Sequence, residues 1–589
     1  MNITMKTLTA LFLENSEKYS ADKKIFFTKN EDDSYSSIDY KAFTQNVSSL
    51  IHFFNFHNLK KGDKVAILSD NRYEWATVDF ACMFAGLISV PSYVSLNPEQ
   101  IKYILNDAEV KIIFVMNKFM LEKIKKIKSE VPALKTIVSF NELPEENLSI
   151  DIINYSTIRK NFSSTEDLEK LSNEIHEEDL LTIIYTSGTT GNPKGVMLSH
   201  KNVYTNIKAC MKVMLINDQD RFLSFLPFCH AYERTTGYYL ALFSGAEIYF
   251  AKNIDTISAQ MPEAKPTILI CVPRLLEKMY SKIVDSPNAV SGFKKKISIW
   301  AINMALERKV KPHSIKWSIA YKLVYSKIAA KTGGELRLMA SGGGALNKNI
   351  SEFFIYMGIT VIEGYGMTEH SPVISVNNPL INKPGTVGPP LNGVNVKIAD
   401  DGEILVQSDS IMQGYYKHPD ETSKTIVNGW LHTGDIGEMD SDGYIKITDR
   451  KKELFKTSGG KYIAPAQIEE MLKQLNYIEQ ILIIGNERMF VTSLIVPQIE
   501  HLKELAKKLK VDYKDENELH TNKEILKEIE KDINLVQKSL STYEKVRRFA
   551  LLEKPFTIED NELTPTMKIK RRIVEEKYKD LIEKMYKNS

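Results

Sequence analysis

Three short apolar runs near the N-terminus alternate with helix patterns, and this alternation restricts the fold more than any other feature. "KVAILSD", "VKIIFV" and "KTIVSF" each have the pattern of a buried strand. The segment "NPEQIKYILND" separates the first two, with Asn97 suited to cap a helix and Pro98 to occupy its first position. The Lys-rich "KFMLEKIKKIKSEV" indicates a second helix. Strands that alternate with helices predict a layered α/β domain.

The pattern changes near residue 390 to short strands separated by turn dipeptides. Asp401-Gly402, Asn428-Gly429 and Asp442-Gly443 supply the positive φ angles that tight hairpin turns need. We therefore predict a small antiparallel β unit at about residues 385–450.

A mixed α+β pattern follows "TDRKKELFK". A helix is predicted at "APAQIEEML", strands at "QILIIG" and "FVTSLIV", and charged helices from about residue 500 to 545. We predict a large N-terminal domain over residues 1–450 and a small α+β C-terminal domain over 451–589, joined by a hinge near 449–452.

Composition excludes several classes of function. The chain has 77 basic and 75 acidic residues, which gives no general case for nucleic-acid binding. Its four cysteines are widely spaced and form no disulfide or CxxC pattern, as expected of a protein in the reducing cytoplasm. The longest apolar segment, "FACMFAGLISVPSYV", is interrupted by Pro91, so no transmembrane helix is expected.

The segment "YTSGTTGNPKG", Tyr185 to Gly195, concentrates four hydroxyls and three glycines around one lysine. Glycines weaken ordinary strands and helices, so this composition needs a local reason. Backbone N–H groups, hydroxyls and a lysine ammonium together suit an anion, and the segment predicts a phosphate-binding loop. The residues expected to bind phosphate are Thr186, Ser187, Gly188, Thr189, Thr190 and Lys194.

A Walker A loop is the nearest familiar pattern, but the match fails at two places. Pro193 stands where the second glycine belongs, and Gly195 replaces the hydroxyl that would hold magnesium. Strand patterns also lie on both sides, with a helix starting only at Ser199. We therefore expect a flap between two strands, and a Walker-type ATPase is the weaker alternative.

Three later segments supply further groups suited to a nucleotide. In "EGYGMTE", Tyr365 suits stacking on a base, Thr368 a contact with phosphate, and Glu369 magnesium ligation through oxygen. "HTGD" ends in Asp435, which suits hydrogen bonds from both ribose hydroxyls. "DR" adds Arg450 just before the predicted domain boundary.

In this order, the motifs resemble those of the adenylate-forming superfamily of acyl-CoA synthetases, luciferases and peptide-synthetase adenylation domains. The resemblance extends from the opening helices to "NELTPTMKIKR", and "HAYER" and "DRKKELFKTSGGKYIAP" are most similar to long-chain fatty acid CoA ligases. It implies a two-step reaction: a fatty acid and ATP give acyl-adenylate and pyrophosphate, and the thiol of coenzyme A then displaces AMP. The implied cofactors are ATP, Mg²⁺ and coenzyme A.

The resemblance also implies residue roles for the adenylation step. Thr186 and Glu369 hold magnesium, the glycine-rich loop holds the β- and γ-phosphates, and Lys568 of "TPTMK" bridges the substrate carboxylate and the α-phosphate. The remaining nucleotide contacts that it implies are Gly343, Gly344, Ala345, Gly364 and Tyr365 around adenine, and Asp435 and Arg450 at ribose.

For the second step, the resemblance implies that the C-terminal domain rotates about Lys452. Ser458, Gly459 and Gly460 then let pantetheine pass close to the backbone. His230 and Glu233 of "HAYER" are expected beside the acyl tunnel. Some long-chain synthetases gate this tunnel with a tryptophan, but this chain has none between Trp75 and Trp300.

Other functions remain open at this point. An acyl-AMP ligase or an acyl-ACP synthetase would pass the acyl group to a carrier protein instead of coenzyme A. A non-catalytic nucleotide-binding protein is less consistent with the full set of phosphate, magnesium and lysine residues. A cytoplasmic location is expected, with peripheral attachment to the inner face of the membrane left open.

Overall fold

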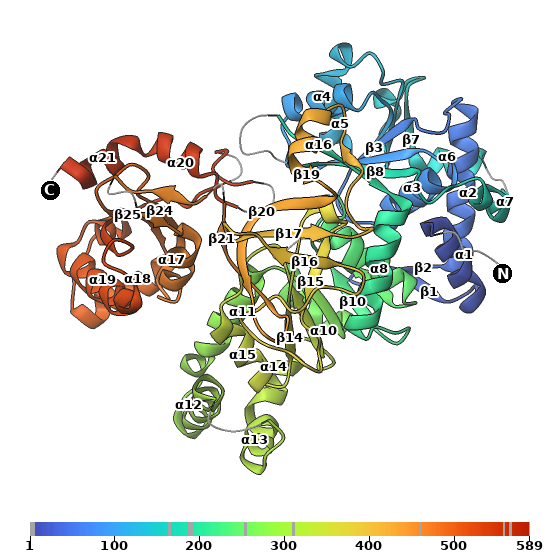
Figure 1. Cartoon of the computed structure of the whole chain (residues 1–589). Coiled ribbons are helices and arrows are strands. Elements are labelled where there is room, and N and C mark those ends of the chain that lie inside the picture. Colours follow the sequence, from blue (N-terminus) through green and yellow to red (C-terminus); the bar gives the residue numbers. More distant parts are fainter. Residues whose placement is uncertain are drawn as a thin grey trace. The chain divides into compact units, whose positions relative to one another are not determined.

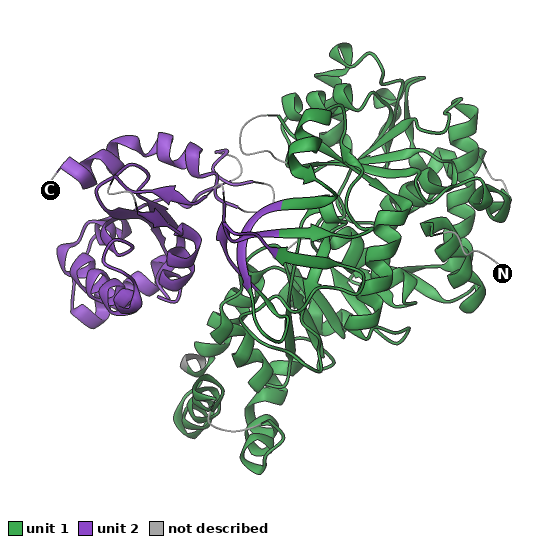
Figure 2. Ribbon diagram, in the orientation of Figure 1, with its two compact units in different colours: residues 1–397, 405–432, 439–445 green, residues 398–404, 433–438, 446–589 purple. Residues whose placement is uncertain are grey.

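The structure is a computed structural model. The chain forms two compact units (Figure 2). It describes residues 6–162, 166–186, 192–252, 256–308, 312–451, 453–458, 461–557, 560–564 and 568–587, without the side chains of residues 288 and 289. Unit 1 comprises residues 1–397, 405–432 and 439–445, and unit 2 comprises residues 398–404, 433–438 and 446–589. No helix of the described part is long and apolar enough to cross a membrane.

An eight-stranded sheet of unit 1 has the order β15-β14-β13-β12-β10-β11-β1-β2 (Figure 1). Its pairs are parallel except at the two ends, where β15 and β2 run antiparallel to their neighbours. The strands are β1 (Lys24–Lys29), β2 (Tyr35–Asp39), β10 (Arg221–Ser224), β11 (Glu247–Phe250), β12 (Ile268–Cys271), β13 (Leu338–Ser341), β14 (Thr360–Gly366) and β15 (Val373–Val376).

A second eight-stranded sheet of unit 1 has the order β18-β9-β8-β4-β3-β5-β6-β7. Strands β8 to β7 of this order run parallel, whereas β9 is antiparallel to β8 and to β18. The strands are β3 (Lys64–Leu68), β4 (Ile88–Pro91), β5 (Val110–Val115), β6 (Thr136–Ser139), β7 (Ile152–Asn154), β8 (Leu180–Thr186), β9 (Lys194–Ser199) and β18 (Gly414–Tyr415). The three apolar runs of the opening segment form β3, β5 and β6, which confirms the predicted layered α/β fold.

Helices connect and cover these strands. The helix predicted after Asn97 begins at Pro98, and Asn97 and Gln100 form a reciprocal capping box. Helix α3 is buried along nearly its whole length and belongs to one hydrophobic cluster that includes residues of both large sheets. The longer helices of unit 1 are α1 (Leu8–Lys18), α2 (Tyr40–Phe56), α3 (Tyr73–Phe84), α4 (Pro98–Asp107), α5 (Lys118–Lys125), α6 (Tyr155–Asn161), α7 (Leu168–Asn173), α8 (His200–Met214), α10 (Ile257–Ala264), α11 (Pro273–Val284), α12 (Gly292–Glu307), α13 (Ile315–Ala320), α15 (Lys348–Tyr356) and α16 (Pro419–Thr425).

Short helical segments complete unit 1. Two are π-helical, η3 (Glu233–Tyr239) and η6 (Tyr321–Tyr325), and each continues into a short α-helix. The short segments are η1 (Lys128–Glu130), η2 (Glu145–Asn147), α9 (Leu240–Phe243), η5 (Ser286–Ala289), α14 (Ser326–Ala330) and η7 (Thr368–His370).

A five-stranded sheet corresponds to the predicted β unit near residues 385–450. Its order is β16-β17-β20-β19, with β21 paired to β20. The glycines of the three predicted turn dipeptides, Gly402, Gly429 and Gly443, all have positive φ angles. The strands are β16 (Asn395–Ile398), β17 (Glu403–Gln407), β19 (Ile426–Val427), β20 (Trp430–Met439) and β21 (Ile445–Arg450).

The rest of unit 2 is an α+β structure, as predicted. Its three-stranded sheet has the order β24-β25-β26, and a short hairpin, β22 with β23, precedes it. Alternate side chains of β24 and β25 belong to two hydrophobic clusters, one with α17, α18 and α19 and the other with α20 and α21. The elements are β22 (Phe455–Lys456), β23 (Tyr462–Ile463), α17 (Pro465–Leu472), β24 (Ile478–Ile484), β25 (Val491–Pro497), α18 (Ile499–Leu509), η8 (Glu516–His520), α19 (Lys523–Val536), η9 (Gln537–Ser539), β26 (Val546–Leu551), α20 (Arg571–Lys577) and α21 (Lys579–Lys587).

Candidate functional site

The glycine-rich loop connects two antiparallel strands. Strand β8 ends at Thr186 and β9 begins at Lys194, and these two residues lie opposite each other in the register. The Thr186 hydroxyl donates a hydrogen bond of 3.5 Å to the carbonyl oxygen of Lys194. A strand on each side distinguishes this loop from a Walker A loop, which runs from strand into helix. The predicted phosphate contacts Ser187, Gly188, Thr189 and Thr190 lie outside the described residues.

The ammonium group of Lys194 is held by two neighbours. It pairs with the carboxylate of Glu421 in α16 and stands 5.2 Å from the ring centroid of Tyr415. Hydrogen bonds from Lys194 and Lys424 lower the pKa of Glu421 to about 2. Glu421 lies more than two hundred residues after the loop on an ordinary charged helix, so no local sequence pattern indicates this pairing.

Glu369 is connected to the same pair of strands. It lies in η7, which follows β14 and packs against β9. The Tyr415 hydroxyl donates a hydrogen bond of 2.9 Å to Oε1 of Glu369, and Tyr415 is paired with Val196 of β9. The predicted magnesium ligands Thr186 and Glu369 therefore belong to elements in direct contact with β9.

The donor set fits magnesium rather than a transition metal. In the part of the chain that the structure describes, no three His, Cys, Asp or Glu side chains gather as a metal site. Mg²⁺ is commonly held by one or two protein oxygens together with substrate phosphates and water. The carboxylate of Glu369 and the hydroxyl of Thr186, next to the predicted phosphate-binding loop, satisfy that description.

The adenine contacts predicted from the sequence extend from two neighbouring strands. Strands β13 and β14 are parallel, with Ser341 opposite Glu363, so their carboxyl ends lie at the same edge of the sheet. Gly343, Gly344 and Ala345 follow β13 and are exposed, while Gly364 and the partly exposed Tyr365 form the end of β14. In open α/β sheets this edge is where ligands bind.

The end of β14 approaches the backbone of the next strand closely. A Cβ atom at Gly366 would collide with the carbonyl oxygen of Pro372, so only glycine fits there. Before it, the buried carboxylate of Glu363 accepts a hydrogen bond of 3.0 Å from the N–H of Gly385. Thr368 follows directly at the start of η7.

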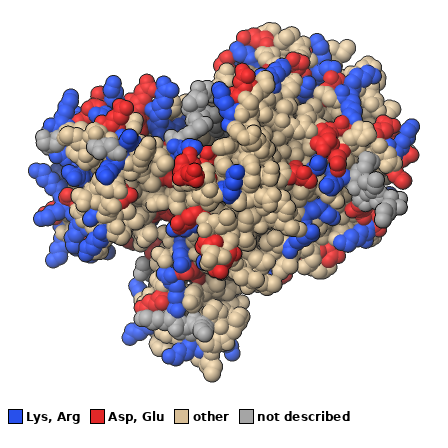
Figure 3. All heavy atoms as spheres, in the orientation of Figure 1, with Lys and Arg blue, Asp and Glu red and all other residues tan. Residues whose placement is uncertain are grey.

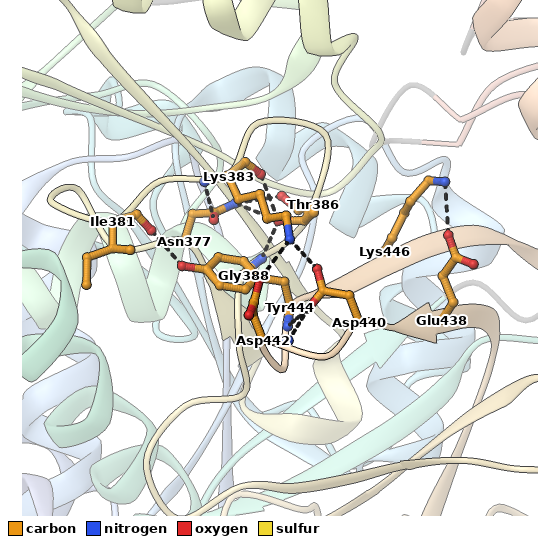
Figure 4. Close-up of polar contacts among 10 residues, drawn as sticks. All are labelled: Asn377, Ile381, Lys383, Thr386, Gly388, Glu438, Asp440, Asp442, Tyr444 and Lys446. Carbon is orange, nitrogen blue, oxygen red and sulfur yellow. Dashed lines mark hydrogen bonds and ion pairs between the residues drawn. The ribbon is translucent and has the colours of Figure 1, made fainter.

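The loop that contains Gly385 is itself fastened to a hairpin turn (Figure 4). The ammonium group of Lys383 pairs with Asp440 at 2.5 Å and with Asp442 at 3.4 Å. The hydroxyl of Tyr444 donates a hydrogen bond of 2.9 Å to the carbonyl oxygen of Ile381. The turn of this hairpin therefore supports the loop whose Gly385 N–H binds Glu363. These contacts were not predicted from the sequence.

The "HAYER" segment contacts β13 and the glycine-rich segment that follows it. The hydroxyl of Tyr232 donates a hydrogen bond of 2.9 Å to the carbonyl oxygen of Ala340, and the N–H of Tyr232 donates one of 3.2 Å to Nδ1 of His230. A Cβ atom at Gly342 would lie 2.7 Å from the Tyr232 ring. His230 is partly buried.

Glu233 begins the π-helix η3 and is only 1% exposed. The Ser224 hydroxyl donates a hydrogen bond of 2.6 Å to its Oε1, whereas Oε2 has no hydrogen-bond partner among the described residues. Burial raises the pKa of Glu233 to about 8, although the bond from Ser224 opposes the shift. This side chain is therefore a neutral carboxylic acid near pH 7, and its predicted place beside the acyl tunnel stays a prediction.

Arg234, the next residue, forms a buried polar network that the sequence motif did not suggest. Its guanidinium pairs with Asp79 of α3 and donates hydrogen bonds of 2.8 Å to Ser89 of β4 and Thr182 of β8. The Tyr239 hydroxyl completes the network with a hydrogen bond of 2.6 Å to Asp79. The network joins η3 to two strands of the second sheet.

Unit 2 contains the predicted ribose contacts. Arg450 Nε lies 3.2 Å from Oδ1 of Asp435, and the N–H of Asp435 donates a hydrogen bond of 3.1 Å to the Thr433 hydroxyl. The side chain of Asp435 is buried, whereas that of Arg450 is about half exposed. The carboxylate oxygens of Asp435 are of the type that accepts hydrogen bonds from hydroxyl groups.

Lys568 lies in the electrostatic field of the same pair. Loss of hydration and then repulsion by Arg450 lower the pKa of Lys568 to about 8, while Asp435 and Glu453 oppose the shift. The residue as a whole is exposed, so its loss of hydration is partial. Unit 2 thus brings together Lys568, Asp435 and Arg450.

The remaining predicted residues lie near the start of the C-terminal region. Ser458 is exposed, and its N–H donates a hydrogen bond of 2.9 Å to the carbonyl oxygen of Arg488. Lys452, Gly459 and Gly460 lie outside the described residues.

Comparison with known families covers nearly the whole chain. The family described as AMP-binding enzyme matches residues 12–416, and the AMP-binding enzyme C-terminal domain matches residues 453–589. The long-chain-fatty-acid–CoA ligase FadD15 of Mycobacterium tuberculosis is 32% identical over 547 residues, which cover 90% of this chain and 88% of that protein. The peroxisomal long chain acyl-CoA synthetase 6 of Arabidopsis thaliana is 33% identical over 568 residues, with 92% and 79% of the two chains covered.

Solved structures share the fold at lower identity. The anthranilate CoA ligase AuaEII in complex with anthranoyl-AMP aligns with a TM-score of 0.76 at 20% identity, over 99% of this chain and 98% of that chain. ATP-bound MatB from Rhodopseudomonas palustris aligns with a TM-score of 0.72 at 21% identity, over 97% and 99% of the two chains. With both family domains matched and curated relatives above 30% identity, the chain belongs to the AMP-binding enzymes, the adenylate-forming superfamily that its motifs predicted.

Proposed function

We propose that this protein is an AMP-forming long-chain fatty acid:CoA ligase. It activates a fatty acid with ATP to give acyl-adenylate and pyrophosphate, and then transfers the acyl group to coenzyme A with release of AMP. The observation that carries this proposal is the similarity, over about 90% of the chain, to ligases named for long-chain fatty acids from a bacterium and a plant.

Two steps are needed because a carboxylate is a poor electrophile without a good leaving group. Joining it to the α-phosphate makes AMP the leaving group, but this requires one anion to attack another. Positioning and charge compensation at the α-phosphate therefore supply most of the catalysis. When bound, Mg²⁺ neutralises phosphate charge.

In unit 1, we assign metal and phosphate binding to the elements around β9. Thr186 and Glu369 are the magnesium ligands, and Lys194 and Thr368 contact phosphate. The bond from Tyr415 to Glu369 supports this assignment, because a ligand carboxylate is usually oriented by an outer hydrogen bond. The other phosphate contacts assigned are Ser187, Gly188, Thr189 and Thr190.

The base and ribose contacts are assigned to three segments. Gly343, Gly344 and Ala345 face one side of adenine, and Gly364 and Tyr365 the other. Asp435 and Arg450 bind the ribose hydroxyls. The strand ends of β13 and β14 support the first part of this assignment, and the ion pair between Asp435 and Arg450 supports the second.

Lys568 is assigned the bridge between the substrate carboxylate and the α-phosphate. A lysine in this position helps the first step but obstructs the thiol in the second. The C-terminal domain, residues 451–589, therefore rotates about a hinge at Lys452, within 449–452, relative to the N-terminal domain, residues 1–450. After this rotation Ser458, Gly459 and Gly460 flank pantetheine.

We also assign His230 and Glu233 to the acyl site. A buried, neutral carboxylic acid is compatible with an apolar acyl chain, whereas a carboxylate would be costly there. We place the enzyme in the cytoplasm, in peripheral contact with the inner face of the membrane. All four cysteines are buried and none forms a disulfide, as suits a reducing compartment.

Product analysis with a panel of fatty acids tests the proposal. The full chain is mixed with ATP, Mg²⁺ and each acid in three parallel reactions. One contains coenzyme A, one contains holo-carrier protein, and one contains neither acceptor. We expect pyrophosphate and AMP, and acyl-CoA only when coenzyme A is present, with long acids preferred. ADP as the nucleotide product overturns the proposal, and acyl transfer to the carrier alone assigns an acyl-ACP synthetase instead.

A further inference from the structure

Two helical segments of unit 1 extend from the sheets as an arm (Figure 1). The arm comprises α12, Gly292–Glu307, and the continuous helix formed by α13, η6 and α14, residues 315–330. Their inner faces pack together: the Tyr325 hydroxyl donates a hydrogen bond of 2.6 Å to the carbonyl oxygen of Ala301. Trp317 Nε1 donates another of 2.6 Å to the carbonyl oxygen of Tyr356. The arm is therefore a firmly packed part of unit 1.

The outer surface of the arm is unusually apolar. Ile315 is 83% exposed and Phe293 77% exposed. Phe293 and Trp300 are seven residues apart in α12, so both lie on one face of that helix. Ile315 and Ile319 are four residues apart and likewise share a face. The exposed large apolar residues of the arm are Phe293, Ile299, Trp300, Ile315, Ile319, Tyr321 and Leu323.

The same segment has a strong positive charge. From residue 292 to 330 the sequence contains nine Lys or Arg and one acidic residue, Glu307, whereas the whole chain is almost balanced at 77 to 75. Lysines border the apolar side chains: Lys294, Lys295 and Lys296 follow Phe293, and Lys316 follows Ile315. None of these four forms an ion pair with another described residue. Figure 3 shows Lys and Arg atoms at the end of the arm.

We propose that this arm docks the protein on the surface of an anionic lipid bilayer. Aromatic and aliphatic side chains enter the boundary between headgroups and acyl chains, and the bordering lysines attract the lipid phosphates. Exposed apolar side chains together with positive charge favour a lipid surface over other partners. A nucleic acid would use the positive charge but not the exposed Ile315 and Ile319. A hydrophobic protein partner would not need so large an excess of positive charge. Fatty acids and long-chain thioesters also partition into bilayers, so docking would shorten their path to the protein.

Vesicle binding by the full chain tests this proposal without any measurement of ligase activity. Flotation is compared on vesicles of phosphatidylcholine alone and of phosphatidylcholine mixed with phosphatidylglycerol, at low and at high NaCl. We expect binding to the anionic vesicles that weakens with salt. The triple variant Lys294→Gln/Lys295→Gln/Lys296→Gln should bind on the order of a hundredfold more weakly. The variant Phe293→Ser/Trp300→Ser/Ile315→Ser should lose binding even at low salt.

Two control variants carry matched changes elsewhere on the surface. Phe119→Ser removes an aromatic side chain that is 66% exposed beside the lysines of α5, and Lys507→Gln/Lys508→Gln/Lys510→Gln removes three lysines at the end of α18. Both should bind vesicles as the unaltered chain does. Acyl-CoA formation from a short, water-soluble acid reports separately on the ligase function and should be unchanged in every variant.

Several outcomes overturn the proposal. No binding to anionic vesicles by the unaltered chain is one, and equal loss in the arm variants and the controls is another. If the unaltered chain sediments as a dimer that Phe293→Ser/Trp300→Ser/Ile315→Ser dissociates, and vesicles are not bound, a second copy covers this face instead. Binding to RNA that depends on the three lysines but not on Phe293, without vesicle binding, also contradicts docking on lipid.

Discussion

The hydroxyl of Tyr415 donates a hydrogen bond of 2.9 Å to Oε1 of Glu369, while the ring of Tyr415 lies under the ammonium group of Lys194. One side chain thus orients both a proposed magnesium ligand and a proposed phosphate ligand. Tyr415→Phe keeps the ring but removes the hydrogen bond. We expect the apparent affinity for Mg²⁺ to fall by roughly tenfold or more, as for other outer-shell partners of metal ligands.

The measurement is a Mg²⁺ titration of pyrophosphate release at saturating ATP and fatty acid. Tyr416→Phe, at the adjacent residue, serves as the control and should leave the titration unchanged. An unaltered Mg²⁺ dependence in Tyr415→Phe would show that this bond does not orient a metal ligand.

Lys568 provides a test of the division of labour between the two half-reactions. Lys568→Ala should slow formation of acyl-adenylate by on the order of a hundredfold or more, since it removes a positive group from the α-phosphate. Thioester formation from supplied acyl-adenylate should stay within a few-fold of the unaltered enzyme. Both half-reactions are measured separately, with Lys570→Ala, two residues away, as the control. Equal loss in the two half-reactions contradicts the role assigned to Lys568.

Much of the fold follows from local patterns in the sequence. Apolar runs and capping residues placed β3, β5, β6 and α4, because these signals act over a few residues. No local sequence pattern of this kind determines the order of the strands in a sheet. The short strand Gly414–Tyr415 joins β9 more than two hundred residues earlier in the chain, and only the assembled fold brings the two together.

The site shows the same contrast. Residues such as Thr186, Glu369 and Asp435 could be selected from the sequence. Each belongs to a short motif, and the motifs follow one another along the chain in a recognisable order. Their supporting partners could not, since Tyr415 and Glu421 have no pattern of their own and act through distant pairing. Resemblance to a family supplied Lys568, whose basic neighbours would otherwise have indicated an exposed surface.

We expect the free energy of unfolding to depend strongly on the buried ion pair between Arg234 and Asp79. Removing one partner leaves the other buried and unpaired, which typically costs about 3–5 kcal/mol. Asp79→Leu and Arg234→Met should therefore each lower the thermal midpoint markedly. The double variant should be less destabilised than the sum of the two single variants, because no unpaired charge remains.

Thermal unfolding of the three variants measures this coupling. Lys24→Met, which removes a partly exposed partner of Asp39, is the control, because exposed pairs contribute only about 0–1 kcal/mol. Simple addition of the two single effects would mean that the pair contributes no specific coupling to the network.

Glu233 predicts a dependence of stability on pH. Burial raises its pKa to about 8, whereas the unfolded chain releases this proton near the ordinary value of 4.5. The folded state then binds more protons than the unfolded state between those two values, so the stability contributed by Glu233 falls as the pH rises through this window. Glu233→Gln cannot ionise and should not show that loss.

Relative to the unaltered chain, Glu233→Gln should gain stability progressively from about pH 4.5 to about pH 8, by at most about 5 kcal/mol in free energy of unfolding. Thermal midpoints across this range measure the difference, with the exposed Glu145→Gln as a control that should show no trend. Ser224→Ala removes the one hydrogen bond that opposes the shift, so it should extend the loss of stability to higher pH. A difference between Glu233→Gln and the unaltered chain that does not change with pH would show that this carboxyl group is already ionised in the folded protein.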